Sequence, residues 1–102
     1  MVKIALFCAA GMSTSMLVEK MKKSASERSI EVDINAYPES ELSKRVDEID
    51  VALLGPQVRF MLDKAKEICD PKNVPVEVIN TMDYGMMNGA KVLDRALELA
   101  KK

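Results

Sequence analysis

The stretch Val2–Cys8, which reads VKIALFC, decides the fold because it is a short apolar run that ends in a cysteine. A run of this length and composition predicts a buried β-strand. The small residues at positions 9–14 (AAGMST) predict a loop, and residues 15–26 have the apolar spacing of an amphipathic helix. The chain is therefore expected to open with a strand, a loop and a helix.

Three further strand–helix pairs follow. Strands are predicted over residues 30–36, 51–54 and 76–79, and helices over residues 40–48, 57–69 and from Met86 or Asn88 to 101, with a loop over residues 80–85. Alternating strands and helices are typical of a parallel sheet with helices on both faces. The first and third strands are continuously apolar and the second alternates, which favours the strand order 2-1-3-4. The sequence predicts one three-layer α/β domain over residues 1–102.

Composition excludes several classes of function. The 102 residues include 15 Lys and Arg against 16 Asp and Glu, which does not suit a strongly basic nucleic-acid-binding protein. The chain has no histidine and only two cysteines, which excludes a Cys-His pair or a cysteine-rich zinc site within it. No metal and no cofactor are expected. No stretch has the length of a membrane helix or the pattern of a signal peptide, so a cytoplasmic location with reduced thiols is predicted.

Topology selects Cys8 as the candidate functional residue. In an open parallel sheet, ligands bind at the carboxyl ends of the strands where the strand order reverses, and the first strand ends there with Cys8. The small-residue loop that follows leads into a helix, whose free amides and dipole favour an anion such as phosphate. The same amides favour the thiolate of Cys8 over its thiol. The expected phosphate-binding residues are Ala9, Ala10, Gly11, Met12, Ser13, Thr14 and Ser15.

This loop differs from two well-known phosphate loops. It lacks the second glycine and the lysine of G-x-x-x-x-G-K-[ST]. A C-x₅-R loop would have arginine at position 14, where this chain has Thr14. Without a guanidinium to hold the equatorial oxygens, a phosphocysteine here is expected to resist hydrolysis, which favours a phosphoryl carrier. The alternatives are a Cys8-dependent phosphatase or arsenate reductase, a regulatory module read through Cys8 phosphorylation, and a purely structural cysteine before a helix cap.

Four segments carry a resemblance to a known family: LFCAAGMSTS at 6–15, LLGPQ at 53–57, PVEVI at 75–79 and YG at 84–85. They resemble the IIB components of the bacterial sugar phosphotransferase system, in particular the lactose/cellobiose (N,N′-diacetylchitobiose) group. The resemblance implies a fold similar to low-molecular-weight tyrosine phosphatases and flavodoxin. It also implies a phosphotransferase whose Cys8 accepts a phosphoryl group from phosphohistidine on IIA. That group then passes to a sugar, such as cellobiose or diacetylchitobiose, held by the membrane component IIC.

Two protein partners are implied, IIA as donor and IIC as acceptor, with membrane contact through IIC alone and no nucleic acid. Loops at the carboxyl ends of the strands are expected to flank Cys8 and to form the docking surface. Its expected residues are Met12, Tyr37, Gln57, Met82 and Tyr84. In the alternative, Gln57 only begins a helix and Tyr84 only packs on the sheet. Cys69, at the end of the third helix, is expected as a buried thiol at the opposite pole.

Overall fold

The computed structural model describes residues 1–9 and 11–101 of the chain. It describes the backbone of residues 11–13 but not their side chains. Four parallel strands form one sheet in the order β2-β1-β3-β4. The strands are β1 (Val2–Cys8), β2 (Val32–Pro38), β3 (Val51–Leu54) and β4 (Val76–Val78). The predicted strand order is confirmed.

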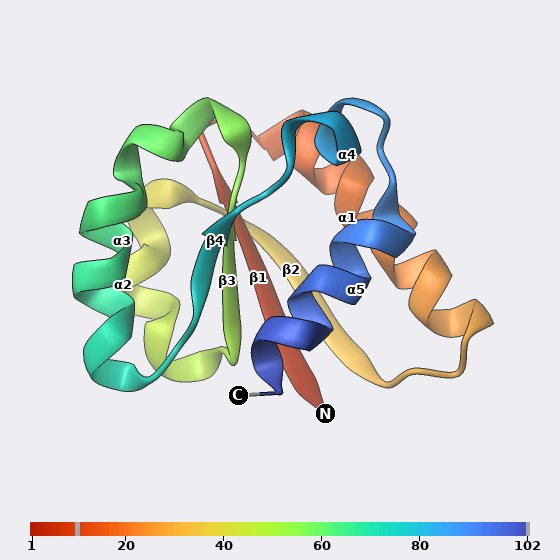
Figure 1. The fold of residues 1–102 in the computed structure, drawn as a ribbon, viewed down its shortest axis with the longest axis horizontal. Coiled ribbons are helices and arrows are strands. Elements are labelled where there is room, and N and C mark those ends of the chain that lie inside the picture. Colours follow the sequence, from red (N-terminus) through yellow and green to blue (C-terminus); the bar gives the residue numbers. More distant parts are fainter. Residues whose placement is uncertain (10, 102) are drawn as a thin grey trace.

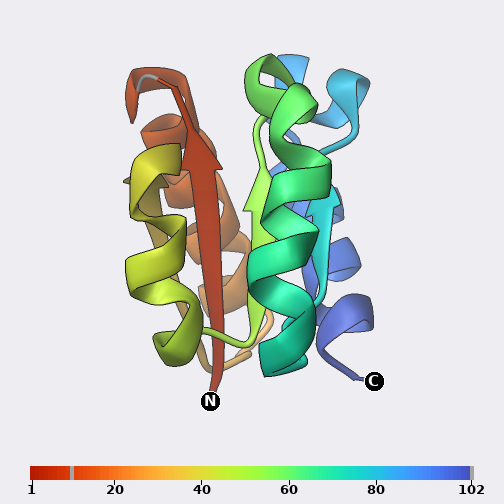
Figure 2. The same cartoon turned by 90° about the vertical axis from the view of Figure 1, so that its left-hand side faces the viewer.

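Helices cover both faces of the sheet (Figure 1). One layer contains α1 (Gly11–Glu27) and α5 (Gly89–Ala100), and the other contains α2 (Leu42–Arg45) and α3 (Leu62–Cys69). The short helix α4 (Thr81–Gly85) follows β4 at the carboxyl end of the sheet. Figure 2 views the molecule from the side of α2 and α3, which lie nearest the viewer. The helical segments around α2 and α3 are extended by the 3-10 helices η1 (Glu39–Glu41), η2 (Val46–Glu48), η3 (Pro56–Met61) and η4 (Asp70–Lys72).

Strand residues alternate between two apolar cores. Ile4 and Leu6 of β1 pack with α1 and α5, whereas Ala5 and Phe7 pack with the α2 and α3 layer. Because side chains alternate across a strand, Cys8 lies on the same face of β1 as Leu6. The sheet therefore directs the cysteine toward the layer that contains α1.

The first helix begins at Gly11, not at Ser15 as predicted. Glycine, serine and threonine are poor helix formers, so the sequence of residues 11–14 favoured a loop. Tertiary contacts outweigh this preference, because the side chain of Thr14 has no exposed surface and its hydroxyl is hydrogen-bonded to Tyr84. Most of the predicted phosphate loop is thus the first turn of α1.

The segment predicted as a loop over residues 80–85 is mostly helical, and the last helix begins at Gly89. The side-chain oxygen of Asn80 accepts hydrogen bonds from the backbone N–H groups of Met82 and Asp83, which caps α4. The prediction was wrong because five residues carry too little periodicity to reveal a helix. An Asn followed by an Asp three residues later was the available signal.

Other boundaries also differ from the prediction, and two of them have a clear local cause. The second strand was predicted over residues 30–36, but β2 begins at Val32 because Ser29 has a left-handed backbone conformation and Ile30 N–H still bonds to Ala25. The predicted helix over residues 57–69 opens instead as η3, where buried Val58 has non-helical angles. Neither change moves the carboxyl edge of the sheet.

Candidate active site

The carboxyl ends of three strands meet beside Cys8. The backbone N–H of Gly55, just after β3, donates to the carbonyl of Phe7 at 2.8 Å. In the same way the N–H of Ile79, just after β4, donates to the carbonyl of Leu54 at 2.8 Å. These bonds hold the turns after β3 and β4 level with the end of β1. The side chain of Cys8 is 1% exposed at this edge.

The amino terminus of α1 follows Cys8 after two residues. The first backbone N–H groups of an α-helix have no partner within the helix, and the helix dipole makes this end positive. Of the predicted phosphate-binding residues, Thr14 is buried, whereas Ala9 and Ser15 are exposed. Ala10 and the side chains of Gly11, Met12 and Ser13 lie outside what the structure describes. The arrangement places a thiol immediately before the anion-favouring end of a 17-residue helix.

A hydrogen-bonded cluster joins three segments at this edge. The side-chain nitrogen of Gln57 in η3 donates to the hydroxyl of Tyr84 in α4 at 2.9 Å. The same hydroxyl lies 3.2 Å from the hydroxyl oxygen of Thr14, in the first turn of α1, and either group can be the donor. These residues are far apart in the chain, at positions 14, 57 and 84. Tyr84 therefore connects the turns after β3 and β4 to the helix that follows Cys8.

The absence of a side chain at Gly55 leaves room for the carboxamide of Gln57. A Cβ atom at Gly55 would lie 2.6 Å from Gln57 Oε1 and 3.4 Å from the Cβ of Cys8. The carboxamide of Gln57 and the side chain of Cys8 thus border the same small space. This arrangement explains the glycine of the LLGPQ segment, because an alanine at position 55 would force the side chain of Gln57 to move.

Tyr37 and Met82 lie in different surroundings from this cluster. The ring of Tyr37 packs beside that of Phe7 with centroids 5.8 Å apart, and the guanidinium carbon of Arg45 lies 4.5 Å from its centroid. Tyr37 thus belongs to the layer of α2 and α3. Met82 is 72% exposed on α4. Of the predicted docking residues whose side chains the structure describes, Gln57 and Tyr84 are hydrogen-bonded to each other.

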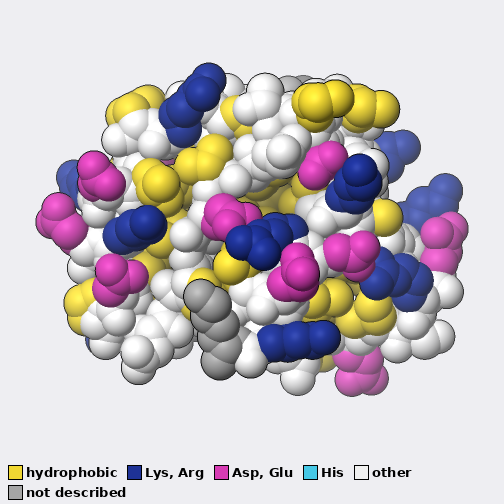
Figure 3. Space-filling model, viewed as in Figure 1, with side chains coloured by type: hydrophobic (Ala, Val, Ile, Leu, Met, Phe, Trp, Pro, Cys, Tyr) yellow, Lys and Arg dark blue, Asp and Glu magenta, His cyan; other side chains and the backbone are white. Residues whose placement is uncertain are grey.

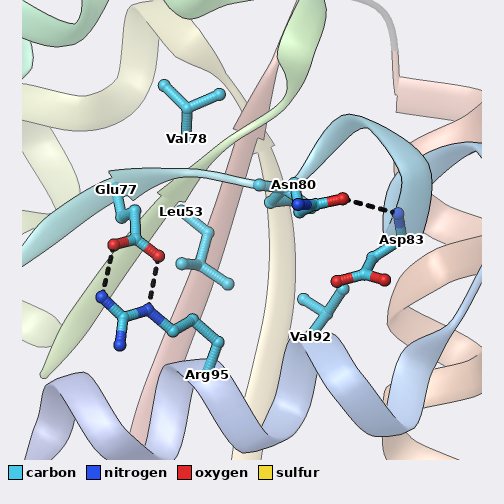
Figure 4. Close-up of a pocket in the computed structure, with 8 residues that line it drawn as sticks. Leu53, Glu77, Val78, Asn80, Asp83, Val92 and Arg95 are labelled. Carbon is cyan, nitrogen blue, oxygen red and sulfur yellow. Dashed lines mark hydrogen bonds and ion pairs between the residues drawn. The ribbon is translucent and has the colours of Figure 1, made fainter.

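The molecule also has a cavity of about 320 Å³ between β4, α4 and α5 (Figure 4). Glu77 and Arg95 point toward one another there and form two hydrogen bonds of 2.7 Å. These bonds raise the pKa of the Arg95 guanidinium above its usual range. The described residues that line the cavity do not include Cys8 or Thr14. The candidate active site is therefore identified by the position of Cys8 before α1 and not by this cavity.

Among the described residues, no group of three or more His, Cys, Asp or Glu side chains is placed to hold a metal ion. No helix within the same residues combines the length and the apolar character needed to cross a membrane.

Comparison with known proteins identifies the family. Residues 3–95 match the family model described as the PTS system, lactose/cellobiose specific IIB subunit, where PTS denotes the phosphotransferase system. The chain belongs to this family. PTS IIB subunits are phosphotransferase components that transfer a phosphoryl group to sugar and work with IIA and IIC partners.

Three relatives illustrate the match. The chain is 45% identical to the PTS system galactose-specific EIIB component of Lactococcus lactis subsp. cremoris, with 94% of each chain covered. It is 40% identical to the oligo-beta-mannoside-specific EIIB component of Bacillus subtilis, covering 97% of this chain and 96% of the relative. The solution structure of the cellobiose-specific IIB component from Borrelia burgdorferi has a TM-score of 0.82 and 49% identity, covering 98% of this chain and 92% of that one. These IIB relatives carry three different sugar names.

Proposed function

We propose that Cys8 of this IIB subunit is a phosphoryl carrier that accepts a phosphoryl group from phosphohistidine of IIA and donates it to a sugar held by IIC. The observation that carries this proposal is the position of Cys8, at the carboxyl end of β1 and directly before the amino terminus of α1. A thiolate is stabilised by this end of a helix, and so are the oxygens of a phosphoryl group. The amino terminus of α1 can then stabilise both the thiolate before transfer and the phosphoryl group after it.

Both steps are in-line displacements at phosphorus. In the first step the Cys8 thiolate forms the S–P bond as the P–N bond of IIA breaks. The departing nitrogen keeps the bonding electron pair and takes up one proton, equal to the one that the Cys8 thiol gave up, which leaves neutral imidazole on IIA. In the second step a sugar hydroxyl forms the O–P bond as the S–P bond breaks, which regenerates the thiolate. The hydroxyl proton passes to a base on IIC. Because both the donor imidazole and this base come from the partners, a chain with no histidine can take part in both steps.

Thr14 favours the carrier over a phosphatase. It occupies the position at which a C-x₅-R loop has arginine, and it is buried and engaged with Tyr84. No guanidinium from this position can stabilise attack by water on the phosphocysteine. The phosphoryl group is therefore retained until a partner presents its own acceptor.

The sugar we propose is a β-linked disaccharide such as cellobiose or diacetylchitobiose. The relatives named for oligo-beta-mannoside and cellobiose support a β-linked sugar, although another relative is named for galactose. The sugar-binding pocket belongs to IIC, which also brings this otherwise cytoplasmic chain to the inner face of the membrane. The carrier role is the same for each of these sugars.

The test is a reconstituted transfer followed by intact-mass measurement. Phosphoenolpyruvate, the general phosphotransferase proteins and a lactose/cellobiose-type IIA are mixed with wild type, Cys8→Ser or Cys69→Ser. We expect one phosphoryl group on wild type and on Cys69→Ser, and none on Cys8→Ser or in mixtures without IIA. No gain on wild type with several competent IIA donors contradicts the proposal. Turnover of an aryl phosphate or arsenate by wild type would support the phosphatase or reductase alternative instead.

A further inference from the structure

The side chain of Gln57 lies where its orientation can depend on whether Cys8 is phosphorylated. Its Oε1 atom lies beside the space over Gly55 that Cys8 also borders, while its Nε2 atom donates to Tyr84. The side chain is otherwise exposed, so it can rotate without disturbing the core. A carboxamide has an acceptor on one end and a donor on the other, and half a turn about its last bond exchanges them.

The two states of Cys8 favour opposite ends of this carboxamide. In the structure, which carries no phosphoryl group, the oxygen of the carboxamide lies on the side of the space over Gly55 and the nitrogen is bonded to Tyr84. A phosphoryl group presents only acceptor oxygens with negative charge, so that it repels Oε1 and attracts an N–H donor. Phosphorylation therefore reverses the preferred orientation of Gln57.

Tyr84 can accommodate either orientation. Its hydroxyl accepts from Gln57 Nε2 in the structure and can equally donate to Gln57 Oε1, because a phenol both donates and accepts. The contact with Thr14 can reverse at the same time, since either hydroxyl can donate. The rotation thus preserves both hydrogen bonds of Tyr84 and adds one to the phosphoryl group.

We propose that Gln57 is a phosphoryl-binding residue that turns its Nε2 toward phosphorylated Cys8, with Tyr84 as the positioning residue that holds it in either orientation. The inference rests on the carrier function proposed above. It supplies a neutral donor at a site that lacks the arginine of C-x₅-R loops. An uncharged amide orients the phosphoryl group without the charge that favours its hydrolysis. Because the carboxamide is exposed, its two orientations also give the surface near Cys8 two forms: the unphosphorylated form meets phospho-IIA, and the phosphorylated form meets IIC.

The decisive measurement uses a property of the sequence: Gln57 is the only glutamine in the chain. Protein labelled with ¹⁵N at the glutamine side chain gives a single NH₂ pair in a proton–nitrogen spectrum. We expect this pair to shift on phosphorylation and to acquire a scalar coupling to ³¹P across the new hydrogen bond. A purely structural role for Gln57 does not produce that coupling. An NH₂ pair that keeps its position and shows no coupling, in protein whose phosphorylation is verified by mass, overturns the inference.

Rate measurements on variants give a second readout. Gln57→Ala is expected to slow transfer from phospho-IIA on the order of tenfold, the effect of one lost hydrogen bond to a charged group. Gln57→Glu keeps the shape but places a carboxylate near the phosphoryl group, so we expect it to be slower still. Tyr84→Phe is expected to weaken the ³¹P coupling without changing the fold. A Gln57→Glu protein that transfers at the wild-type rate contradicts the contact.

Glycine variants form a matched pair. Gly55→Ala displaces Gln57 Oε1, whereas a Cβ at Gly85 would meet nothing within 4 Å. We expect Gly55→Ala to slow transfer and to move the Gln57 resonance in the unphosphorylated protein, and Gly85→Ala to do neither. Equal behaviour of the two variants contradicts the inference. If wild type gains no phosphoryl group at all, the carrier function has failed instead, and the mass measurement distinguishes these cases.

Discussion

At the scale of single residues, the two cysteines show how position determines chemistry. Both are within the described residues and neither forms a disulfide. Cys69 lies at the end of α3 in the core between that helix and the sheet, and it has no exposed surface. Desolvation by burial, helped by the neighbouring charge of Asp70, raises the pKa of its thiol to about 11. The thiol predicted at this position is indeed buried.

The raised pKa of Cys69 predicts a loss of stability at alkaline pH. The thiol of an unfolded chain has a pKa of about 8.5, so above that pH the unfolded chain releases a proton that the folded chain retains. The stabilisation is therefore complete below about pH 8.5 and decreases as the pH rises through about 11, by on the order of 3 kcal/mol in unfolding free energy. Urea unfolding at several pH values measures this decrease.

The control is Cys69→Ala, which removes the titrating group. Its absolute stability falls because a cavity forms, so the comparison is between slopes against pH. We expect a shallower alkaline slope for the variant. Identical slopes for the two proteins would show that Cys69 does not titrate in this way.

At the scale of elements, the packing of α5 on α1 depends on one close contact. A Cβ at Gly89 would lie 2.5 Å from the backbone carbonyl carbon of Lys20 and 2.6 Å from the backbone nitrogen of Met21. Backbone atoms inside a helix cannot move aside as a flexible side chain can. The helices therefore approach closely because residue 89 is glycine. The spacing of apolar residues predicted both helices, but it contains no information on how closely α5 approaches α1.

Replacing Gly89 by alanine has two opposing effects on the free energy of unfolding, a gain in helix propensity and a loss from overpacking. Alanine favours a helix over glycine by up to about 1 kcal/mol, and less at the first residue of a helix. Overpacking costs about 1–3 kcal/mol, and the contacts at Gly89 are with backbone. We expect Gly89→Ala to lower the unfolding free energy and Gly85→Ala to leave it nearly unchanged. Urea unfolding of both variants measures the difference, and a Gly89→Ala protein as stable as wild type would contradict the close packing.

At the scale of the whole molecule, large apolar side chains are exposed near the site. Among the described side chains, the exposed ones other than Met1 are Met16 on α1, Phe60 in η3, Met82 on α4 and Met86 directly after α4. Met16, Phe60 and Met82 lie in the helical segments that directly follow β1, β3 and β4, and Met86 follows the last of these segments. Figure 3 shows hydrophobic side chains along the upper edge of the molecule, above α4, and charged ones across the middle. An exposed apolar surface on these elements suits the docking of the two successive partners proposed above.

This distribution predicts that Met82 contributes to docking and not to folding. Met82→Ser is expected to leave the unfolding free energy unchanged, because the side chain is mostly exposed. It is expected to raise the KM for phospho-IIA by roughly fivefold through lost apolar contact, with the rate at saturation unchanged. Lys101→Ser, at the amino edge of the sheet, is the control. Equal KM values for Met82→Ser and the control would place the docking surface elsewhere.

Much of this protein follows from local sequence. The number and type of the strands, their order and the position of Cys8 at the carboxyl edge could be predicted, since apolar periodicity and chain alternation are local properties with few topological solutions. The helix at residues 11–14 could not, because poor helix formers are held there by a tertiary contact of Thr14. Helix α4 escaped prediction because it is one turn long.

The contacts among Thr14, Gln57 and Tyr84 arise only in the folded chain. Each residue is ambiguous in the sequence, where a glutamine after Gly55-Pro56 and a tyrosine before Gly85 fit a turn or a surface equally well. Hydrogen bonds between residues 27 and 70 positions apart depend on the angles and spacing of three elements, which no local pattern contains. The position of Cys8, the proposed nucleophile, is thus predictable from the chain alone. The side chains that surround it are brought together by the packing of the sheet and its helices.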